Sequence, residues 1–256
     1  MEENSVAKSS RRRIVLKISG EGFCPAHERG IAMESVNRLA SQIAEVADSN
    51  IEIAIVMGGG NILRGAAFKA ANSSIQEVTA HHMGMLATLI NGLALQDAIE
   101  ALGRPTRLMT TVRADTVAEP YIRRRADHHL EKGRVVIIAG GTGLPFVTTD
   151  TAAAQRALEL GADILLKATK VDGVYSDDPE KNPGAIFYDH LSYEEVSLQK
   201  LRVMDQEAIA KCAGHRMPVM VFNFRTAGNL LRAAKGDHVG TLISDRSFQE
   251  TNSPFN

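Results

Sequence analysis

The chain has 256 residues, 44% of them hydrophobic, which suits one large α/β domain or two closely joined lobes. A formal net charge of −1 disfavours a nucleic-acid partner, because nucleic-acid-binding domains usually carry a basic excess. Cys24 and Cys212 form no CxxC pair, which disfavours structural zinc and a secreted disulfide scaffold and favours the cytoplasm. No apolar run approaches the roughly 18 residues that span a bilayer, so no membrane partner is expected.

The first twelve residues are polar and lack the apolar core of a signal peptide. They are predicted to be a disordered tail, with a weak nucleic-acid or targeting role as the alternative. In chain order, hydrophobic spacing then predicts strands over 14–18, 51–57, 107–109 and 135–139, and helices over 33–47, 78–102, 121–131 and 151–160. The helix over 78–102 is apolar nearly all round, which predicts burial.

The second half of the chain predicts a strand over 164–167, turns over 171–183, a helix over 206–213, a strand over 219–222 and a helix over 229–234. A last strand over 240–244 is expected at the sheet edge, and 247–256 as a second tail. Alternating strands and helices imply an α/β three-layer sandwich with a mainly parallel central sheet. Ligands in such sheets bind at the carboxyl ends of the strands.

Glycine-rich turns follow three of the predicted strands: Gly20 and Gly22, then Gly58–Asn61, then Gly140–Gly143. Glycine lets the backbone approach an anion closely and present its N–H groups. Any one of these turns could be ordinary chain reversal, but the three together favour phosphate binding. The chain has neither the Gly-Lys-Ser/Thr string of a P-loop nor a G-x-G-x-x-G string, so its phosphate site must be built differently.

Two basic residues stand beside these turns. Lys17 lies within an apolar strand, where its charge needs a partner such as a phosphate oxygen; the alternative is an edge strand with Lys17 facing water. Arg64 follows the triglycine turn and could neutralise the charge of a transferring phosphate; the alternative is an ordinary surface arginine.

Asp150 and Asp205, near predicted strand ends, are candidates to approach Mg²⁺, with helix capping as the alternative for each. The pairs His81-His82 and His128-His129 are not assigned to a metal, because adjacent helical residues point about 100° apart. No dedicated metal-ligand set is therefore assigned.

Several strings together resemble bacterial-type UMP kinases of the amino-acid-kinase superfamily, over roughly residues 14–244. The superfamily turns are Lys17–Glu21 and Gly58–Gly65, and the UMP branch is indicated by MGMLAT at 83–88 and TGLPFVTTD at 142–150. Further matches are Lys167–Tyr175, Val203–Asp205 and Val221–Asn223. The resemblance implies the amino-acid-kinase fold over 13–246, with an acceptor-binding part at about 13–160 and an ATP-binding part at about 161–246.

The resemblance also implies UMP kinase activity, in which the γ-phosphoryl group of ATP passes to UMP and gives UDP and ADP in pyrimidine biosynthesis. Catalytic roles would fall to Lys17, Arg64, Asp150 and Asp205. ATP would be bound by Lys17, Ile18, Ser19, Gly20, Gly60, Arg64, Thr169, Tyr175 and Asp178. UMP would be bound by Gly59, His81, Thr142, Gly143, Leu144, Pro145, Phe146, Val147, Thr148 and Thr149. ATP would carry Mg²⁺, and the enzyme would be a homohexamer that GTP and UTP regulate.

Two positions depart from the family pattern. The family usually has an acidic residue at position 81, which binds the UMP ribose; here it is His81, and Glu77 one turn earlier could compensate. The segment 24–30 does not match the family loop associated with GTP activation, which leaves that activation open.

Two other functions are weighed against UMP kinase. A related kinase acting on a carboxylate or carbamate would lack the TGLPFVTTD block. A nucleotide-binding storage or regulatory protein on the same scaffold could keep the ATP site and lose turnover, but the presence of Lys17, Arg64, Asp150 and Asp205 disfavours it.

Overall fold

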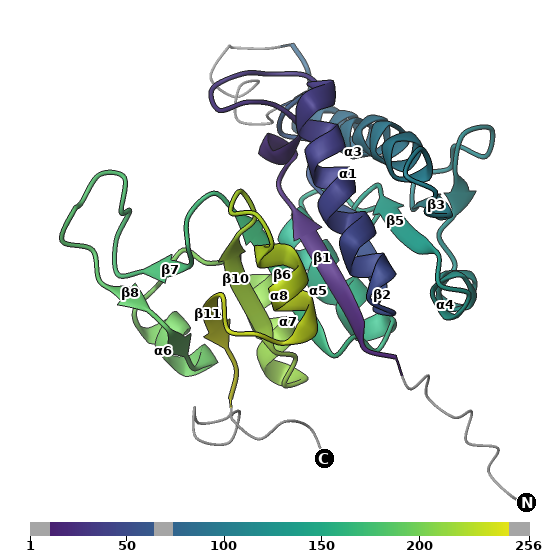
Figure 1. Cartoon of the computed structure of the whole chain (residues 1–256). Coiled ribbons are helices and arrows are strands. Elements are labelled where there is room, and N and C mark those ends of the chain that lie inside the picture. The colour runs from purple at the N-terminus through teal and green to yellow at the C-terminus, as the bar shows by residue number, and fades with distance from the viewer. Residues whose placement is uncertain (1–10, 64–73, 246–256) are drawn as a thin grey trace, which may run out of the picture.

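The computed structural model describes residues 11–63 and 74–245. Its centre is a nine-stranded sheet in the order β4-β3-β5-β2-β1-β6-β10-β11-β9, parallel throughout except where β11 runs antiparallel to β10. Helices cover both faces (Figure 1), so the predicted three-layer α/β sandwich with a mainly parallel sheet is confirmed. None of the helices in the described ranges is both long and apolar enough to cross a membrane.

The strands and helices of the first half follow the predicted alternation. The strands are β1 Arg13–Ile18, β2 Glu52–Met57, β3 Thr106–Thr110, β4 Glu119–Pro120 and β5 Val135–Ala139. The helices are η1 Gly20–Phe23, α1 Met33–Asp48, α3 Glu77–Glu100, α4 Arg123–Glu131 and α5 Thr149–Glu159. Helix α4 starts two residues later than predicted, because Tyr121 and Ile122 are still extended after β4.

The second half contains short elements that periodicity does not reveal. Its strands are β6 Ile164–Thr169, the hairpin β7 Val174–Tyr175 and β8 Phe187–Tyr188, then β9 His190–Leu191, β10 Val219–Asn223 and β11 Gly240–Ile243. Its helices are α6 Tyr193–Leu198, α7 Gln206–Gly214 and α8 Asn229–Lys235. The prediction that the last strand lies at the edge is wrong, because β9 pairs with β11 on its outer side.

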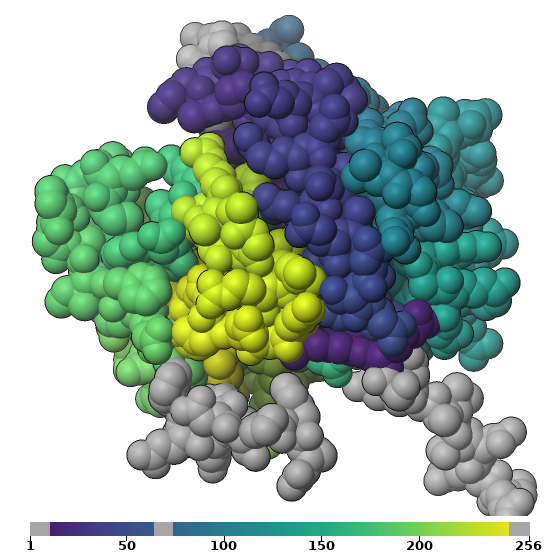
Figure 2. All heavy atoms as spheres, viewed as in Figure 1, coloured from purple at the N-terminus to yellow at the C-terminus, as the bar shows by residue number. Residues whose placement is uncertain are grey.

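Side-chain alternation along the central strands divides the core into two layers. In β1, Ile14, Leu16 and Ile18 face the layer that contains α1, α3 and α8. Val15 faces the opposite layer, which contains α4, α5 and α7. Figure 2 shows α1 and α8 covering the first face side by side. Because side chains alternate with a period of two, Lys17 is directed to the same face as Val15, towards α5.

Helix α3 is not buried on all sides, which corrects the prediction made from its composition. Val78, Leu86 and Ile90, spaced by multiples of four residues, are 40%, 46% and 48% exposed. This spacing places them along one stripe of the helix, and the opposite side packs on α1, β3 and β5. The helix therefore has an apolar face that the described part of this chain leaves uncovered.

Three consecutive arginines at the amino edge of the sheet each cap a different helix. Arg11 donates to the carbonyl oxygens of Leu130 and Glu131 at the end of α4. Arg12 donates to Lys235 at the end of α8 (3.1 Å), and Arg13 donates to the C-cap residue of α5, Leu160 (2.6 Å). Cations are favourable at helix carboxyl ends, where unpaired carbonyls and the helix dipole present negative charge.

Glu52 is the buried counterion of this arginine group. Its side chain is 0% exposed and lies 2.9 Å from Arg11 Nη2 and 2.7 Å from Arg13 Nε. Arg13 also pairs with Asp127 of α4 at 2.9 Å. These ion pairs tie β1 and β2 to α4 on one face of the sheet, while the hydrogen bond from Arg12 reaches α8 on the other face.

We expect Glu52→Ala to lower the free energy of unfolding by about 3–5 kcal/mol, because it leaves buried guanidinium charge without its carboxylate. The matched control is Glu207→Ala, which removes an exposed i,i+4 partner of Lys211 and should cost less than about 0.5 kcal/mol. Urea unfolding of both variants measures the difference. If both variants lost the same free energy of unfolding, the buried ion pairs of Glu52 would contribute no more to stability than the exposed pair of Glu207.

Candidate active site

The site lies at the carboxyl edge of the sheet, where the parallel strands β5, β2, β1, β6 and β10 end next to one another. The three glycine-rich turns follow β1, β2 and β5 along this edge. Ile18 is the buried last residue of β1, and Ser19 and Gly20 follow it into η1. The turns that the sequence singled out are therefore brought together, as the strand order requires.

The turns after β1 and β2 touch through their glycines. A Cβ on Gly20 would lie 2.5 Å from the Gly60 nitrogen and 2.6 Å from Asn61 Oδ1, so only glycine fits. Gly59 is equally confined, with Ala87 Cβ of α3 at 2.7 Å from its ideal Cβ position. A Cβ on Gly60 would meet no atom of the described residues within 4 Å, so these residues leave space beside it for a ligand.

A buried amide pair holds the second turn in place. Asn61 and Asn91 exchange side-chain hydrogen bonds of 2.9 and 2.8 Å, and Asn91 also donates to the Gly58 carbonyl. Because Asn91 is fully buried in α3, the turn is fixed to the middle of that helix.

Lys17, Asp150 and Lys167 form an ionic cluster at the centre of this edge. Asp150 Oδ1 lies 2.6 Å from Lys17 Nζ, and its Oδ2 accepts a 2.7 Å hydrogen bond from Lys167 Nζ. Lys167 also donates to the Val203 carbonyl at 2.5 Å. Lys17 is 8% exposed on a central strand, so the alternative of a water-facing edge strand is wrong.

Burial and charge act in opposite directions in this cluster. Burial would raise the pKa of Asp150, but the two lysines more than offset it and hold the pKa below its usual range. The pKa of Lys167 is lowered, chiefly by burial and further by the charge of Lys17, against the favourable charge of Asp150. Two ammonium groups thus share one carboxylate, and a bound anion would relieve that imbalance.

Asp205 connects α7 to the turn that follows β5. It caps α7 by accepting a hydrogen bond from Ala208 N, as its capping alternative proposed. It also accepts hydrogen bonds from the hydroxyls of Thr148 and Thr151, at 2.5 and 2.8 Å. Asp150 is not the N-cap of α5, contrary to its capping alternative: Thr148 fills that place and leaves Asp150 to face the lysines.

Sequence reasoning missed Lys167 as a site residue. Lys167 lies on β6, where it is paired in register with Lys17 of the neighbouring strand β1. The signal was available, because Lys167 also interrupts an apolar strand just before its carboxyl end. The argument applied to Lys17 would have found it.

The residues of the second half that are expected to bind ATP lie at the end of β6, in β7 and in the loop after β7. Thr169 ends β6, with its hydroxyl 2.7 Å from the Val171 carbonyl. Tyr175 in β7 packs edge-on against Phe187, with ring centroids 5.3 Å apart. Asp178 lies in the exposed loop after β7, where its carboxylate accepts a hydrogen bond from Glu180 N and pairs with Lys181, both nearby in the sequence. Arg64 lies outside the described residues.

The residues after β5 that are expected to bind UMP form a loop that contacts α3. Thr88 accepts a 2.7 Å hydrogen bond from Gly140 N, which anchors the loop to the helix. Phe146 adopts a positive φ of 64° and is 60% exposed, while its ring lies 4.7 Å from that of His81. A bulky residue in that conformation costs energy and suggests a functional constraint. The remaining residues, Thr142, Gly143, Leu144, Pro145, Val147, Thr148 and Thr149, continue this loop into α5.

The histidine pairs show no metal arrangement: among the described residues, no three His, Cys, Asp or Glu side chains could hold an ion together. His129 instead pairs with Glu119 at 3.2 Å and contacts Arg134.

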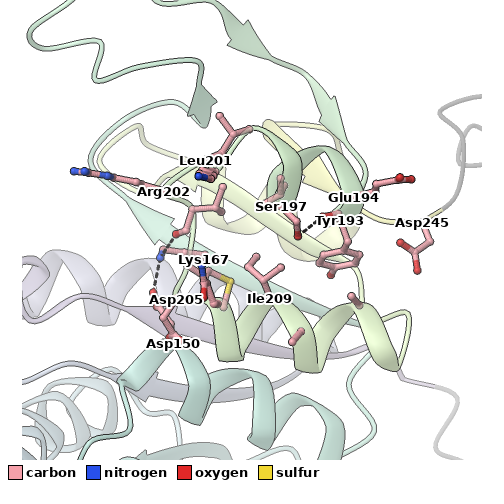
Figure 3. Close-up of a pocket in the computed structure, with 17 residues that line it drawn as sticks. Asp150, Lys167, Tyr193, Glu194, Ser197, Leu201, Arg202, Asp205, Ile209 and Asp245 are labelled. Carbon is pink, nitrogen blue, oxygen red and sulfur yellow. Dashed lines mark hydrogen bonds and ion pairs between the residues drawn. The ribbon is translucent and has the colours of Figure 1, made fainter.

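A cavity of about 950 Å³ opens from the ionic cluster between α6 and α7. Figure 3 shows Asp150, Lys167 and Asp205 at one end and Tyr193 and Asp245 at the other. The cluster is therefore accessible from this side.

The model of the amino acid kinase family matches residues 12–223 of this chain. The chain belongs to the amino acid kinase family. Within that family it is similar to the uridylate kinase of Methylococcus capsulatus, at 52% identity over 91% of this chain and 96% of the relative. It is 50% identical to the uridylate kinase of Xanthomonas euvesicatoria pv. vesicatoria, over 94% of this chain and 100% of the relative.

Solved structures of amino acid kinases support the same relationship. The UMP kinase from Bacillus anthracis superposes with a TM-score of 0.88 at 40% identity, covering 92% of this chain and 97% of that one. The UMP kinase from Ureaplasma parvum gives 0.85 at 35% identity, with 91% and 99% coverage. The chain is thus an enzyme of the phosphotransferase class with the amino acid kinase fold.

Proposed function

We propose that this chain transfers the γ-phosphoryl group of ATP to UMP, giving UDP and ADP in pyrimidine nucleotide biosynthesis. The observation that carries the proposal is the Lys17–Asp150–Lys167 cluster, which lies where the glycine-rich turns of β1 and β2 leave the sheet. The relatives of about 50% identity, named uridylate kinases, support UMP as the acceptor.

The ATP phosphates would lie along the first two turns, on Lys17, Ile18, Ser19, Gly20, Gly60 and Arg64. Thr169, Tyr175 and Asp178 would bind the adenosine from the second half of the chain, at about 161–246. The open space beside Gly60 and the buried charge of Lys17 support the phosphate part of this assignment.

UMP would lie between the turn after β2 and the loop after β5, in the half at about 13–160. Gly59, His81 and the loop Thr142–Thr149 would contact it. The positive φ of Phe146 and its ring contact with His81 support a role for this loop in binding a ligand.

In the reaction, an oxygen of the UMP phosphate forms a bond to the γ-phosphorus of ATP while the bond to the bridging oxygen breaks, releasing ADP. The acceptor phosphate is already ionised near neutral pH, so no strong general base is needed. Lys17 and Lys167 would neutralise charge on the transferring group, and Asp150 would position both ammonium groups. Asp205 would position the start of α5 through Thr148 and Thr151.

Mg²⁺ would be carried mainly by the ATP phosphates and would shield their negative charge. The carboxylates of the site suit this arrangement rather than a protein cage. Asp150 faces two lysines, and Asp205 accepts hydrogen bonds from two hydroxyls and a backbone N–H.

We also propose assembly as a homohexamer in the cytoplasm. The exposed apolar stripe of α3 supports contact between copies, because a surface of this kind is stabilised when a partner covers it. Cys24 and Cys212 are buried and form no disulfide, which suits a reducing compartment. GTP and UTP are the candidate effectors of such an assembly.

The acceptor is tested by measuring ADP release with ATP and Mg²⁺ in the presence of UMP, CMP, dUMP or acetylglutamate. We expect turnover with uridine nucleotides only. Turnover with acetylglutamate would replace the proposal with another kinase of the family. Tight ATP binding without turnover on any acceptor would replace it with a storage or regulatory role.

Lys167→Met should lower kcat/KM for UMP about 10²- to 10³-fold, since it removes a fixed cation from the transferring phosphate. Lys170→Met is the matched control: it lies three residues further on, is exposed and pairs only with Glu180 among the described residues, so its kcat/KM should stay within about twofold. Thermal melting of both variants checks folding. A Lys167→Met enzyme with unchanged kcat/KM would remove this lysine from the mechanism.

His81→Asp should raise the preference for UMP over dUMP, because a carboxylate can accept hydrogen bonds from both ribose hydroxyls whereas neutral imidazole accepts one. The measurement is the ratio of kcat/KM for the two nucleotides in wild type and variant. His82→Asp, on the next and more exposed position of α3, is the control and should leave the ratio unchanged. The hypothesis fails if His81→Asp gains no discrimination.

A further inference from the structure

The turn after β5 has a backbone whose shape depends on its surroundings. Gly140 and Gly141 have positive φ values of 81° and 61°, in the left-handed region that favours glycine. Two adjacent glycines can adopt many conformations, because they carry no side chain that would restrict the backbone. Groups outside the turn must therefore select the one conformation that is present.

Three side chains from different parts of the chain bond to these two glycines. Thr88 of α3 accepts a 2.7 Å hydrogen bond from the N–H of Gly140. Thr111, directly after β3, donates to the Gly140 carbonyl at 2.8 Å. Arg156 of α5 donates from its Nη2 to the Gly141 carbonyl at 3.4 Å. The two threonines thus fix the first glycine, and the arginine fixes the peptide group that follows the second.

Arg156 is itself held in place by neighbouring side chains. It is 7% exposed, and its Nη1 lies 2.5 Å from Glu159 Oε2. Its guanidinium carbon lies 4.1 Å from the ring centroid of Tyr121, whose hydroxyl donates a 2.8 Å hydrogen bond to the same carboxylate oxygen. Burial would raise the pKa of Glu159, but the hydrogen bonds from Gln155, Tyr121 and Arg156 lower it below its usual range. The carboxylate therefore stays charged opposite the guanidinium.

The surroundings of Arg156 do not satisfy all of its donors. Its Nε is buried and meets no acceptor among the described residues. A buried donor without an acceptor costs free energy, so this side chain is not arranged for stability alone. The contact with the Gly141 carbonyl is the part of its environment that leads to the candidate active site.

The Gly141 carbonyl determines where the next N–H group points. A peptide group is planar and trans, so the carbonyl of Gly141 and the N–H of Thr142 point in opposite directions. Because the carbonyl is turned towards Arg156, the N–H of Thr142 is turned away from that side chain. Within the described ranges this N–H donates to no backbone acceptor, which leaves it available to a ligand.

We propose that Arg156 is a positioning residue for the acceptor nucleotide. By fixing the peptide group between Gly141 and Thr142, it holds the Thr142 N–H where the acceptor binds. Glu159 and Tyr121 act through Arg156, because they set the place of its guanidinium group. ATP is assigned to the turns after β1 and β2, so its binding does not depend on this contact. The inference rests on the proposed function and adds a residue to its acceptor site.

Calorimetric titration of UMP and of ATP into wild type and Arg156→Lys tests the proposal without turnover. Lysine keeps the positive charge near Glu159 but lacks the planar fork that reaches Glu159 and Gly141 together. We expect the Kd of UMP to rise about tenfold, as for the loss of one charge-assisted hydrogen bond, and the Kd of ATP to stay within about twofold. Arg232→Lys, at an exposed arginine of α8, is the matched control and should change neither Kd.

Tyr121→Phe is a second variant, which keeps the ring beside the guanidinium and removes only the hydroxyl that bonds to Glu159. It should raise the Kd of UMP about threefold alone and add nothing to Arg156→Lys, because both changes act on one guanidinium. Thermal melting checks that each variant is folded, and Tyr121→Phe decides the matter if Arg156→Lys is not.

The outcomes separate this inference from the proposed function. If wild type binds UMP and the folded variants bind it equally well, the positioning role is overturned and the acceptor assignment stands. Equal weakening of UMP and ATP binding would also overturn the positioning role, because it would mark a general structural defect. If wild type binds ATP but not UMP, the proposed function fails and this inference fails with it.

Discussion

The pairing of Asp150 with two lysines, one buried (Lys17) and one partly buried (Lys167), is the constraint around which the candidate active site is arranged. Charges out of water are costly unless each has a partner with good geometry. Asp150 can reach both ammonium groups only because Lys17 and Lys167 occupy facing positions on adjacent parallel strands. The adjacency of β1 and β6 therefore matters chemically as well as structurally, because separating these two strands would take one of the lysines away from Asp150.

The same constraint explains why the site is spread over distant parts of the sequence. Asp150 comes from the start of α5, and it is free to face the lysines because Thr148 caps that helix in its place. Asp205, itself a helix cap, fixes Thr148 from the other side. Two ordinary capping arrangements thus hold one carboxylate between two cations, and the glycine turns supply the space into which an anionic ligand fits.

Much of this fold could be predicted from sequence because its main strands are continuous apolar runs, as in β5, Val135–Ala139, which matched its predicted bounds. What could not be predicted depends on distant pairing. Strand β9 has only two residues, and nothing local marks it as the partner that displaces β11 from the edge. Helix α6 is different: Ser192 and Glu195 form a capping box, a local signature that could have revealed it. For the site, the types of residue were visible, but the contact of Lys167 with Asp150 required the register of β1 and β6.

The central position of β1 also has a consequence for how the chain is made. Its first neighbour, β2, follows within about forty residues, but its second neighbour, β6, begins at Ile164, opposite Ile14. During synthesis β1 therefore keeps one edge unpaired until the much later β6 has been made. Sheets closed by such distant contacts fold slowly, and unpaired edges favour association with other chains. The strands before β6 are thus unable to complete this sheet by themselves, and the second edge of β1 stays open to wrong partners until β6 is available.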